Sequence, residues 1–281
     1  MKECVIFCAA GFDGLAIPLT EEDYLIAADG GLKHMESLGV TPNAIIGDFD
    51  SLNYIPTGAE VFPVEKDDTD SMLAVKLGLS KGYNRFLIYG GLDGVRLDHT
   101  VANYQALQYL ADRDARGILI GRDFCATVIR NGALRFPGGK QGDISVFCMG
   151  PDAQGVNIEG LYYSLKNGTL TSGFPLGVSN HFTEKCARIA VKEGSLLVLW
   201  RKAAGLPERM KNPLLGEGGR AVGPDGCGAG PSLQQGDPSV SLRLTAPFTQ
   251  GSLPLIRQGL RPCHLPRRGR RPPAGASFVR P

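Results

Sequence analysis

The sequence AIIGDFDS, residues 44–51, joins a short apolar run to a loop that carries two carboxylates. A β-branched run that ends at glycine is typical of a buried strand leading into a loop. Because side chains alternate along an extended backbone, we expect Asp48 and Asp50 on the same side of the chain. Two neighbouring carboxylates repel each other unless a cation lies between them, and Mg2+ binds carboxylates together with substrate phosphates. The stretch therefore indicates a metal site; the alternative is a loop in which Asp50 or Ser51 caps a helix.

Composition bounds the class of protein. The chain of 281 residues can form one large domain or two ordinary ones, and its hydrophobic content of 43% is normal for a globular protein. No apolar run approaches the roughly 20 residues that span a bilayer, and the N-terminal residues do not resemble a signal peptide, so we expect no membrane partner. Most of the seven cysteines lie in apolar runs and none forms a CxxC pair. This pattern favours reduced thiols and a cytoplasmic location over disulfides or structural zinc.

The charge is unevenly distributed along the chain. Residues 203–281 contribute +7, so residues 1–202 carry −5, and an acidic body argues against nucleic acid as a partner. Residues 203–281 also hold 12 of the 19 prolines and 13 of the 38 glycines, without any apolar period. We expect this segment to be a disordered tail. The alternatives are a basic tail that touches RNA or acidic lipid, and translation past the natural end or out of frame.

Residues 1–123 alternate strand-like and helix-like segments, which predicts a mostly parallel α/β sheet covered on both faces. In such sheets ligands bind beyond the carboxyl ends of the strands. The expected strands are 4–9, 24–28, 44–46, 60–64, 85–89 and 117–120, and the expected helices are 32–38, 71–79 and 97–113.

Residues 124–202 are rich in short β-type runs separated by turn signals. The turns are Asn131-Gly132, Asn167-Gly168 and Glu193-Gly194, and Asn-Gly between strands is the strongest short-range hairpin signal. This half is therefore predicted to be a C-terminal antiparallel β-sandwich that follows the α/β domain.

Three further polar clusters follow the strands of the α/β half. ADGG at residues 28–31 places Asp29 where glycines allow a ligand to approach the backbone. KDDTD at residues 66–70 precedes a helix whose amides favour phosphate, although Thr69 or Asp70 could equally be a helix cap. In GGLDGVRLDH, residues 90–99, Arg96 is suited to a bidentate grip on phosphate and Asp98 to a carboxylate cluster or to proton acceptance. His99 alone is more often a structural group than a catalyst.

Together these four clusters resemble thiamine pyrophosphokinases in both order and spacing. The resemblance continues through GLYYSL at residues 160–165 and GVSN at residues 177–180, and covers about residues 1–202. It implies an α/β domain that binds ATP and Mg2+, a β-sandwich that binds thiamine, and a homodimer with active sites between subunits. It also implies transfer of the diphosphate group of ATP to the hydroxyl of thiamine, with release of AMP. The sequence differs from the family pattern at Val95, Tyr162 and His181. These differences concern the binding of thiamine and leave the expected metal site unchanged.

The resemblance and the residue chemistry assign the same roles. The expected metal ligands are Asp48, Asp50 and Asp70, and the expected catalytic residues are Asp29, Asp98 and Arg96, with Asp98 preferred as the proton acceptor. The expected substrate-binding residues are Lys66, Asp67, Thr69, Gly91, Gly94, His99, Tyr163, Ser179 and Asn180.

Two other functions fit parts of this pattern. One is a diphosphokinase that acts on a pterin alcohol with a similar aspartate-rich α/β domain; the segment Ser179-Asn180 favours thiamine over this reading. The other is a nucleotide- or thiamine-binding module without turnover, against which the number of retained carboxylates argues.

Overall fold

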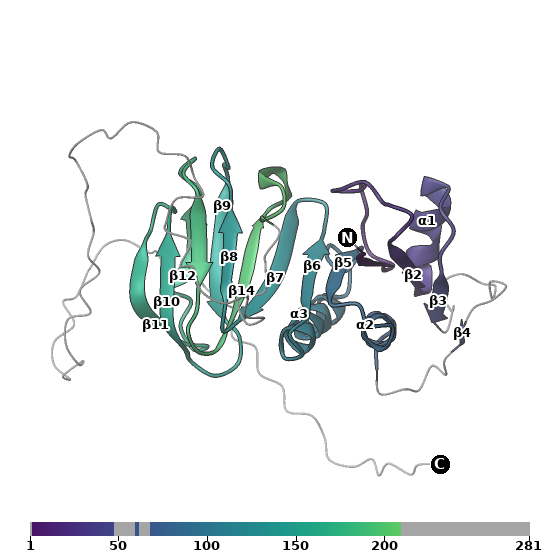
Figure 1. The fold of residues 1–281 in the computed structure, drawn as a ribbon, viewed down its shortest axis with the longest axis horizontal. Helices are drawn as coiled ribbons and strands as arrows, with labels where there is room; N and C mark the ends of the chain where they lie inside the picture. Colours follow the sequence, from purple (N-terminus) through teal and green to yellow (C-terminus); the bar gives the residue numbers. More distant parts are fainter. Residues whose placement is uncertain (1, 48–59, 62–67, 209–281) are drawn as a thin grey trace, which may run out of the picture. The chain divides into compact units, whose positions relative to one another are not determined.

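The computed structural model describes residues 2–47, 60–61 and 68–208 (Figure 1). The sequence-predicted residues Asp48, Asp50, Lys66 and Asp67 lie outside these ranges. The compact unit that contains the described residues is built on two β-sheets, which we call sheet A and sheet B.

One end of sheet A is parallel throughout. Its strands lie in the order β4-β3-β2-β1-β5-β6, and each adjacent pair is parallel. This confirms the predicted parallel sheet of the N-terminal half. The strand bounds are β1 (Cys4–Phe7), β2 (Tyr24–Ala28), β3 (Ala44–Gly47), β4 (Glu60–Val61), β5 (Arg85–Tyr89) and β6 (Arg116–Ile120).

Helices cover both faces of this parallel region. The helices are α1 (Leu32–Leu38), α2 (Asp70–Ser80) and α3 (Leu97–Ala111). The hydrophobic cluster that contains Val5 includes side chains of α1, whereas the cluster that contains Ile6 includes side chains of α2 and α3. Because successive strand residues point to opposite faces, α1 lies on one face and the other two helices on the other.

The helix ends follow their capping residues. Gly39 ends α1 in the left-handed conformation, with φ 67°, where a side chain would be strained. Thr69 caps α2, because its hydroxyl accepts a hydrogen bond from the Met72 N–H at 3.2 Å. Of the two predicted caps, Thr69 is therefore confirmed, and Asp70 is instead the first residue of the helix.

Sheet A does not stop at residue 123. It continues through β7 (Phe124–Arg130), β14 (Ser195–Arg201), β9 (Asp143–Cys148) and β12 (Gly177–His181) to make ten strands, and each of these four pairs antiparallel with its neighbour. The expected domain boundary falls between β6 and β7, which are themselves paired. The division into domains 1–123 and 124–202 stays a prediction, but the β-rich half shares a sheet with the α/β half.

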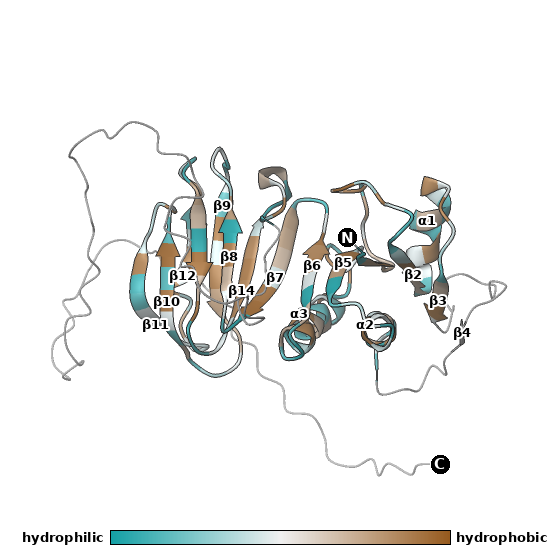
Figure 2. Cartoon of the chain, in the orientation of Figure 1, coloured by the Kyte–Doolittle hydropathy of each residue, from teal (hydrophilic) through white to brown (hydrophobic). Residues whose placement is uncertain are grey.

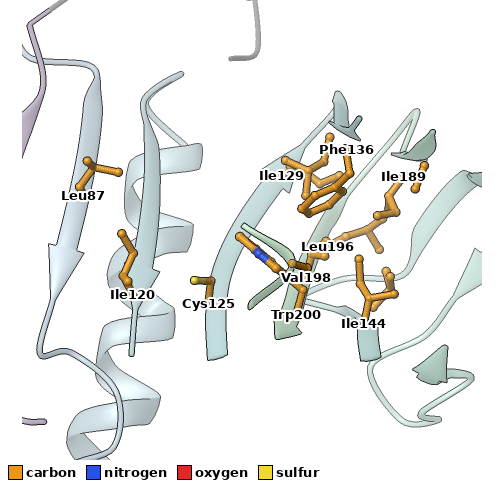
Figure 3. Packing of buried hydrophobic residues seen from close by; sticks show 14 of the residues in the cluster. Leu87, Ile120, Cys125, Ile129, Phe136, Ile144, Ile189, Leu196, Val198 and Trp200 are labelled. Carbon is orange, nitrogen blue, oxygen red and sulfur yellow. The ribbon is translucent and has the colours of Figure 1, made fainter. Parts of the chain in front are cut away.

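Sheet B supplies the second layer of the β-rich half. Its antiparallel strands are β11 (Leu165–Leu170), β10 (Ala153–Glu159), β13 (Ala187–Ala190) and β8 (Ala133–Phe136), in that order. From Val156 to Glu159, hydrophobic residues of β10 alternate with hydrophilic ones, as expected for a strand with one buried face (Figure 2). Phe136 of sheet B packs edge-on against Trp200 of sheet A, with ring centroids 5.3 Å apart, in the core shown in Figure 3.

The hairpins expected at the two Asn-Gly signals are not found, whereas the turn predicted at Glu193-Gly194 does separate two strands. Asn131-Gly132 and Glu193-Gly194 each connect strands of different sheets, and Asn167-Gly168 lies within β11, where its register with β10 shifts. The local conformation was right, since Asn131 and Asn167 both have positive φ. The sequence signal defines a tight turn, but packing between the two sheets decides which strands pair.

No helix in residues 2–47 and 68–208 is long and apolar enough to cross a membrane.

The chain remains packed beyond the expected start of the tail. After β14 a short 3-10 helix, η2 (Lys202–Ala204), buries Ala204. The fully buried Trp200 donates its indole N–H to the Gly205 carbonyl at 2.8 Å, and the Glu208 N–H donates to Arg135 at 2.8 Å. Residues 203–208 therefore belong to the body of the protein, and the predicted boundary after Lys202 lies too early.

This packing changes what truncation should do. A chain that ends at Lys202 loses the buried Ala204 and leaves the Trp200 N–H without its acceptor, which costs about 1–3 kcal/mol. We expect its melting temperature, measured by calorimetry, to fall by roughly 5 °C or more. A chain that ends at Glu208 is the matched control and should melt with the full-length protein. Equal melting of all three chains would contradict the packing described here.

Candidate active site at the carboxyl ends of the parallel strands

The loops that follow β1, β2 and β5 meet because these strands are neighbours in sheet A. The Cys8 N–H donates to the Tyr89 carbonyl at 2.8 Å, and the Ala10 N–H donates to Gly90 at 2.9 Å. Two glycines permit this approach: a Cβ at Gly31 would lie 1.9 Å from the Phe7 oxygen, and one at Gly90 would lie 2.3 Å from the Cys8 oxygen. Larger residues would separate the loops that carry the polar clusters.

The carboxylates of Asp29 and Asp70 each lie near Cys8. Burial, aided by the negative charges of Asp70 and Asp29, raises the pKa of the Cys8 thiol to about 12. Both carboxylates therefore lie near the end of β1, although they are 41 residues apart in sequence. Asp29 also has φ 48°, an unusual conformation for a residue with a side chain, and such conformations concentrate at functional sites.

The donor chemistry of this pair suits a hard divalent cation. Both are half-buried carboxylates, and a hard cation prefers their oxygen atoms to the nearby thiol sulfur of Cys8. Within residues 2–47, 60–61 and 68–208 no three His, Cys, Asp or Glu side chains gather closely enough to form a metal site by themselves. A complete site would draw further ligands from Asp48 and Asp50, which lie outside those ranges.

The N-terminus of α2 adds a polarised helix end. Asp70 lies in the first turn, where a negative charge interacts favourably with the helix dipole. The Thr69 hydroxyl is engaged in capping and in a contact with Ser71 Oγ at 3.1 Å. Thr69 therefore has a structural role, and its predicted phosphate contact stays a prediction. The Asp68 carboxylate forms an ion pair with Lys76, with Oδ2 2.6 Å from Nζ.

The glycine-rich loop after β5 is anchored at Gly91 and Asp93 and projects beyond Asp93. Gly91 is buried, and Asp93, with φ 61°, accepts a hydrogen bond from the Arg122 N–H at 2.6 Å. Gly94 and the fully exposed Val95 form the projecting part. The loop thus presents Arg96 at the start of α3.

Arg96 and Asp98 form a bidentate ion pair. Arg96 Nη2 lies 2.5 Å from Asp98 Oδ2, and Arg96 Nε lies 3.2 Å from Oδ1. The Arg96 hydrogen bonds, aided by the His99 N–H, lower the pKa of Asp98 to about 2. Asp98 is thus a weak base while it is paired. His99 follows in the first turn of α3 and is exposed.

The predicted thiamine residues lie on and beside β12, and one of them has a structural role. Asn180 is 3% exposed; its Oδ1 accepts from the N–H groups of Tyr163 and His181 at 2.9 Å each, and its Nδ2 donates to the Tyr163 carbonyl at 2.7 Å. The Asn180 side chain therefore fixes the backbone at Tyr163. The predicted hydrogen bond from this side chain to a pyrimidine edge does not fit its orientation here, because these atoms already have backbone partners.

Tyr163 and Ser179 are more accessible. Tyr163 is exposed, and its ring meets Tyr162 edge-on with centroids 4.8 Å apart. Ser179 is exposed with φ 58°, and its N–H donates to Ser145 Oγ at 3.1 Å. Both side chains can contact a ligand.

A cavity of about 410 Å³ lies between the glycine-rich loop and β9. Gly94 and Leu97 line one side, and Ser145 and Phe147 line the other. Ser179 donates its N–H to the hydroxyl of Ser145, which lines the cavity. Tyr163 and Asn180 are not part of the lining. The structure thus brings the glycine-rich loop close to the neighbourhood of Ser179.

Asn180 provides a prediction about stability. Asn180→Ala removes three part-buried hydrogen bonds of a buried side chain, and leaving such groups unpaired costs about 1–3 kcal/mol, so its melting temperature should fall by roughly 5 °C. Ser179→Ala changes an exposed neighbour and should melt within about 1 °C of the wild type. An Asn180→Ala variant as stable as Ser179→Ala would refute the structural role.

Sequence inspection missed Asn103 and Ser71, which connect the α2 N-terminus to the glycine-rich loop. Asn103 occupies a core-facing position of α3, because Leu107 and Leu110 at helical spacing are both buried. A polar residue within an apolar stripe was the available signal.

Comparison with known proteins matches both halves of the chain to models of one protein family. The family model described as thiamin pyrophosphokinase, catalytic domain, matches residues 18–119, and the model described as thiamin pyrophosphokinase, vitamin B1 binding domain, matches residues 136–196. A curated relative, thiamine pyrophosphokinase of Bacillus subtilis, is 26% identical over 197 residues, which cover 64% of this chain and 88% of the relative.

Solved structures share the fold. A thiamine pyrophosphokinase structure from Bacillus subtilis aligns with a TM-score of 0.62 at 24% identity, covering 72% of this chain and 99% of the other. One from Geobacillus thermodenitrificans aligns with a TM-score of 0.59 at 23% identity, covering 72% and 97%.

Proposed function

Since the chain belongs to the thiamin pyrophosphokinase family, whose catalytic and vitamin B1 binding models together match more than half of it, we propose that it transfers the diphosphate group of ATP to thiamine. The thiamine hydroxyl oxygen forms a bond to the β-phosphorus of ATP, the bond from that phosphorus to the oxygen bridging it to the α-phosphorus breaks, and AMP leaves. The observation that carries the proposal at the site is the convergence of Asp29, Asp70 and the Arg96 loop at the carboxyl ends of β1, β2 and β5.

Mg2+ fits the acidic side of the site. Asp70, with Asp48 and Asp50 from outside the described ranges, would hold the ion, with Asp29 beside it. Bound there, Mg2+ would offset the negative charge that develops on the phosphates during transfer. Lys66 and Arg96 would position the phosphates.

Arg96 and Asp98 couple phosphate binding to proton acceptance. A phosphate that takes the two Arg96 donors displaces Asp98, because a guanidinium fork serves one bidentate partner at a time. The pKa of Asp98, lowered to about 2 by the pairing, then returns toward its ordinary value. Asp98 thus becomes a better base for the thiamine hydroxyl proton when ATP is in place.

The thiamine ring would be held by the β-rich half. The exposed face of Tyr163 attracts a planar cation by roughly 0.5–2 kcal/mol, depending on how much water is removed. Ser179 offers a hydroxyl nearby, and Asn180 acts through the backbone of Tyr163.

A homodimer with active sites between its subunits explains two groups of exposed apolar residues. Val95, Leu97 and Val101 lie around the start of α3, and Phe174, Leu176 and Val178 lie at β12. Covering such groups is favourable, and one copy could cover those of the other. The cytoplasmic location is proposed from the sequence: the thiols of Cys4, Cys8 and Cys125 are free and buried, as such a location favours, whereas Cys186 is disulfide-bonded, against the expectation of reduced cysteines.

The competing functions can be separated by substrate. A pterin diphosphokinase would turn over a pterin alcohol in preference to thiamine, and a binding module would turn over neither. The vitamin B1 binding match favours thiamine. A side-by-side assay with equal concentrations of the two alcohols tests the proposal, and faster turnover of the pterin alcohol would overturn it.

A further inference from the structure

Asn103 is a buried polar side chain with partners on two sides. Its residue is 6% exposed within the second turn of α3. Its Nδ2 donates to the Gly91 carbonyl at 2.8 Å, and its Oδ1 accepts from Ser71 Oγ at 2.7 Å. A buried amide is tolerated when its donors and acceptors are paired, so these contacts hold the side chain in one orientation. If the amide were reversed, Oδ1 would face the Gly91 carbonyl oxygen and two acceptors would meet.

The hydrogen bonds continue from Ser71 to the end of α2. The Ser71 hydroxyl gives its single proton to Asn103, so Thr69 is the donor in the Thr69–Ser71 contact of 3.1 Å. Thr69 Oγ1 in turn accepts from the Met72 N–H at 3.2 Å. A chain of hydrogen bonds with one direction therefore runs from α2 through Ser71 and Asn103 to the glycine-rich loop.

This chain connects two segments that must act on one ligand. The α2 end carries Asp70, and the glycine-rich loop carries Arg96. The loop backbone packs tightly here, because a Cβ at Gly91 would lie 3.3 Å from Asn103 Nδ2 and 2.6 Å from Leu119. Asn103 therefore bridges the two segments through its two hydrogen bonds.

We propose that Asn103 is a positioning residue that aligns the α2 N-terminus with the glycine-rich loop for binding of Mg·ATP, acting through Ser71 and without touching the substrate. The proposal rests on the proposed function. Misplacing a binding group by about 1 Å can reduce kcat/KM by roughly 100-fold, which indicates the size of effect that such a link controls.

Two variants and one control test the proposal. Asn103→Leu removes both hydrogen bonds, and Ser71→Ala removes only the link to α2. Thr127→Val is the control: it breaks another buried hydrogen bond, from Thr127 to the Gly117 carbonyl at 2.7 Å near the amino end of β6. Calorimetry would measure the dissociation constant for Mg·ATP, a coupled assay kcat/KM, and thermal unfolding the melting temperature.

We expect Asn103→Leu to weaken Mg·ATP binding by about tenfold and to lower kcat/KM by roughly 10- to 100-fold. Thr127→Val should lose comparable stability and keep wild-type values for both. Ser71→Ala should weaken binding as well, and its effect should be smaller when Asn103 is already leucine, because both act through one chain.

The outcomes separate the two proposals. Wild-type Mg·ATP binding by folded Asn103→Leu, or by Ser71→Ala if Asn103→Leu does not fold, would overturn the positioning role. So would equal weakening of Mg·ATP binding by Thr127→Val. Failure of the wild-type protein to form AMP from ATP and thiamine would instead overturn the proposed function.

Discussion

Asp70→Asn should lower turnover by about 100- to 1,000-fold, because it removes one of the charges that we propose to hold Mg2+ against the developing charge on the phosphates. Its effect on stability without Mg2+ should be small. Removing the carboxylate loses a helix-dipole interaction of only about 0.3–1 kcal/mol. Asp48→Asn and Asp50→Asn are expected to reduce turnover equally.

Asp68→Asn is the matched control for this prediction. Asp68 is two residues from Asp70, but its carboxylate pairs with Lys76 at 2.6 Å in a partly exposed ion pair, which contributes little to stability. Turnover would be measured against Mg2+ concentration for all four variants. Near wild-type activity of Asp70→Asn at limiting Mg2+, or an equal loss in Asp68→Asn, would show that Asp70 is not a metal ligand.

Arg96→Lys should lower kcat/KM by roughly 100-fold, because an ammonium group cannot reproduce the two parallel hydrogen bonds of a guanidinium on phosphate. Arg130→Lys is the control: Arg130 forms an exposed ion pair with Asp112 at 3.3 Å, and it should retain full activity. Steady-state kinetics with ATP as the varied substrate distinguishes the two, and an unchanged kcat/KM in Arg96→Lys would remove Arg96 from the phosphate site.

The same ion pair makes a prediction about pH. The Arg96 contact holds the pKa of Asp98 at about 2, below its usual value near 4, so the pair contributes to stability above about pH 4 and loses that contribution as the pH falls toward 2. NMR titration should therefore find a low pKa for Asp98 in the free protein and a higher one when Mg·ATP is bound. A pKa unaffected by Mg·ATP would contradict the exchange of partners at Arg96.

The sequence correctly predicted those helices and strands whose bounds are determined by neighbouring residues. The helix that ends at Gly39 and the strand at 85–89 were predicted with their observed bounds, because a left-handed cap and an apolar run between turns are determined by neighbouring residues. The order of the polar clusters also placed Asp29, Asp70 and the Arg96 loop at one edge of the sheet.

The features that prediction missed depend on distant contacts. The continuation of sheet A from β6 into β7 depends on pairing across the whole sheet, and Asn-Gly signals cannot specify it. The structural role of Asn180 depends on the backbone of Tyr163, 17 residues away. Asn103 is hydrogen-bonded to Gly91, 12 residues away, and to Ser71, 32 residues away, so only the folded protein shows this chain of hydrogen bonds.

The central claim concerns which group leaves ATP. Incubating the protein with ATP, Mg2+ and thiamine, and separating the products by chromatography, measures AMP, ADP and thiamine diphosphate together. Diphosphate transfer predicts equal amounts of AMP and thiamine diphosphate, no ADP, and no AMP when thiamine is omitted. Formation of ADP with thiamine monophosphate, or release of AMP without thiamine, would contradict the account.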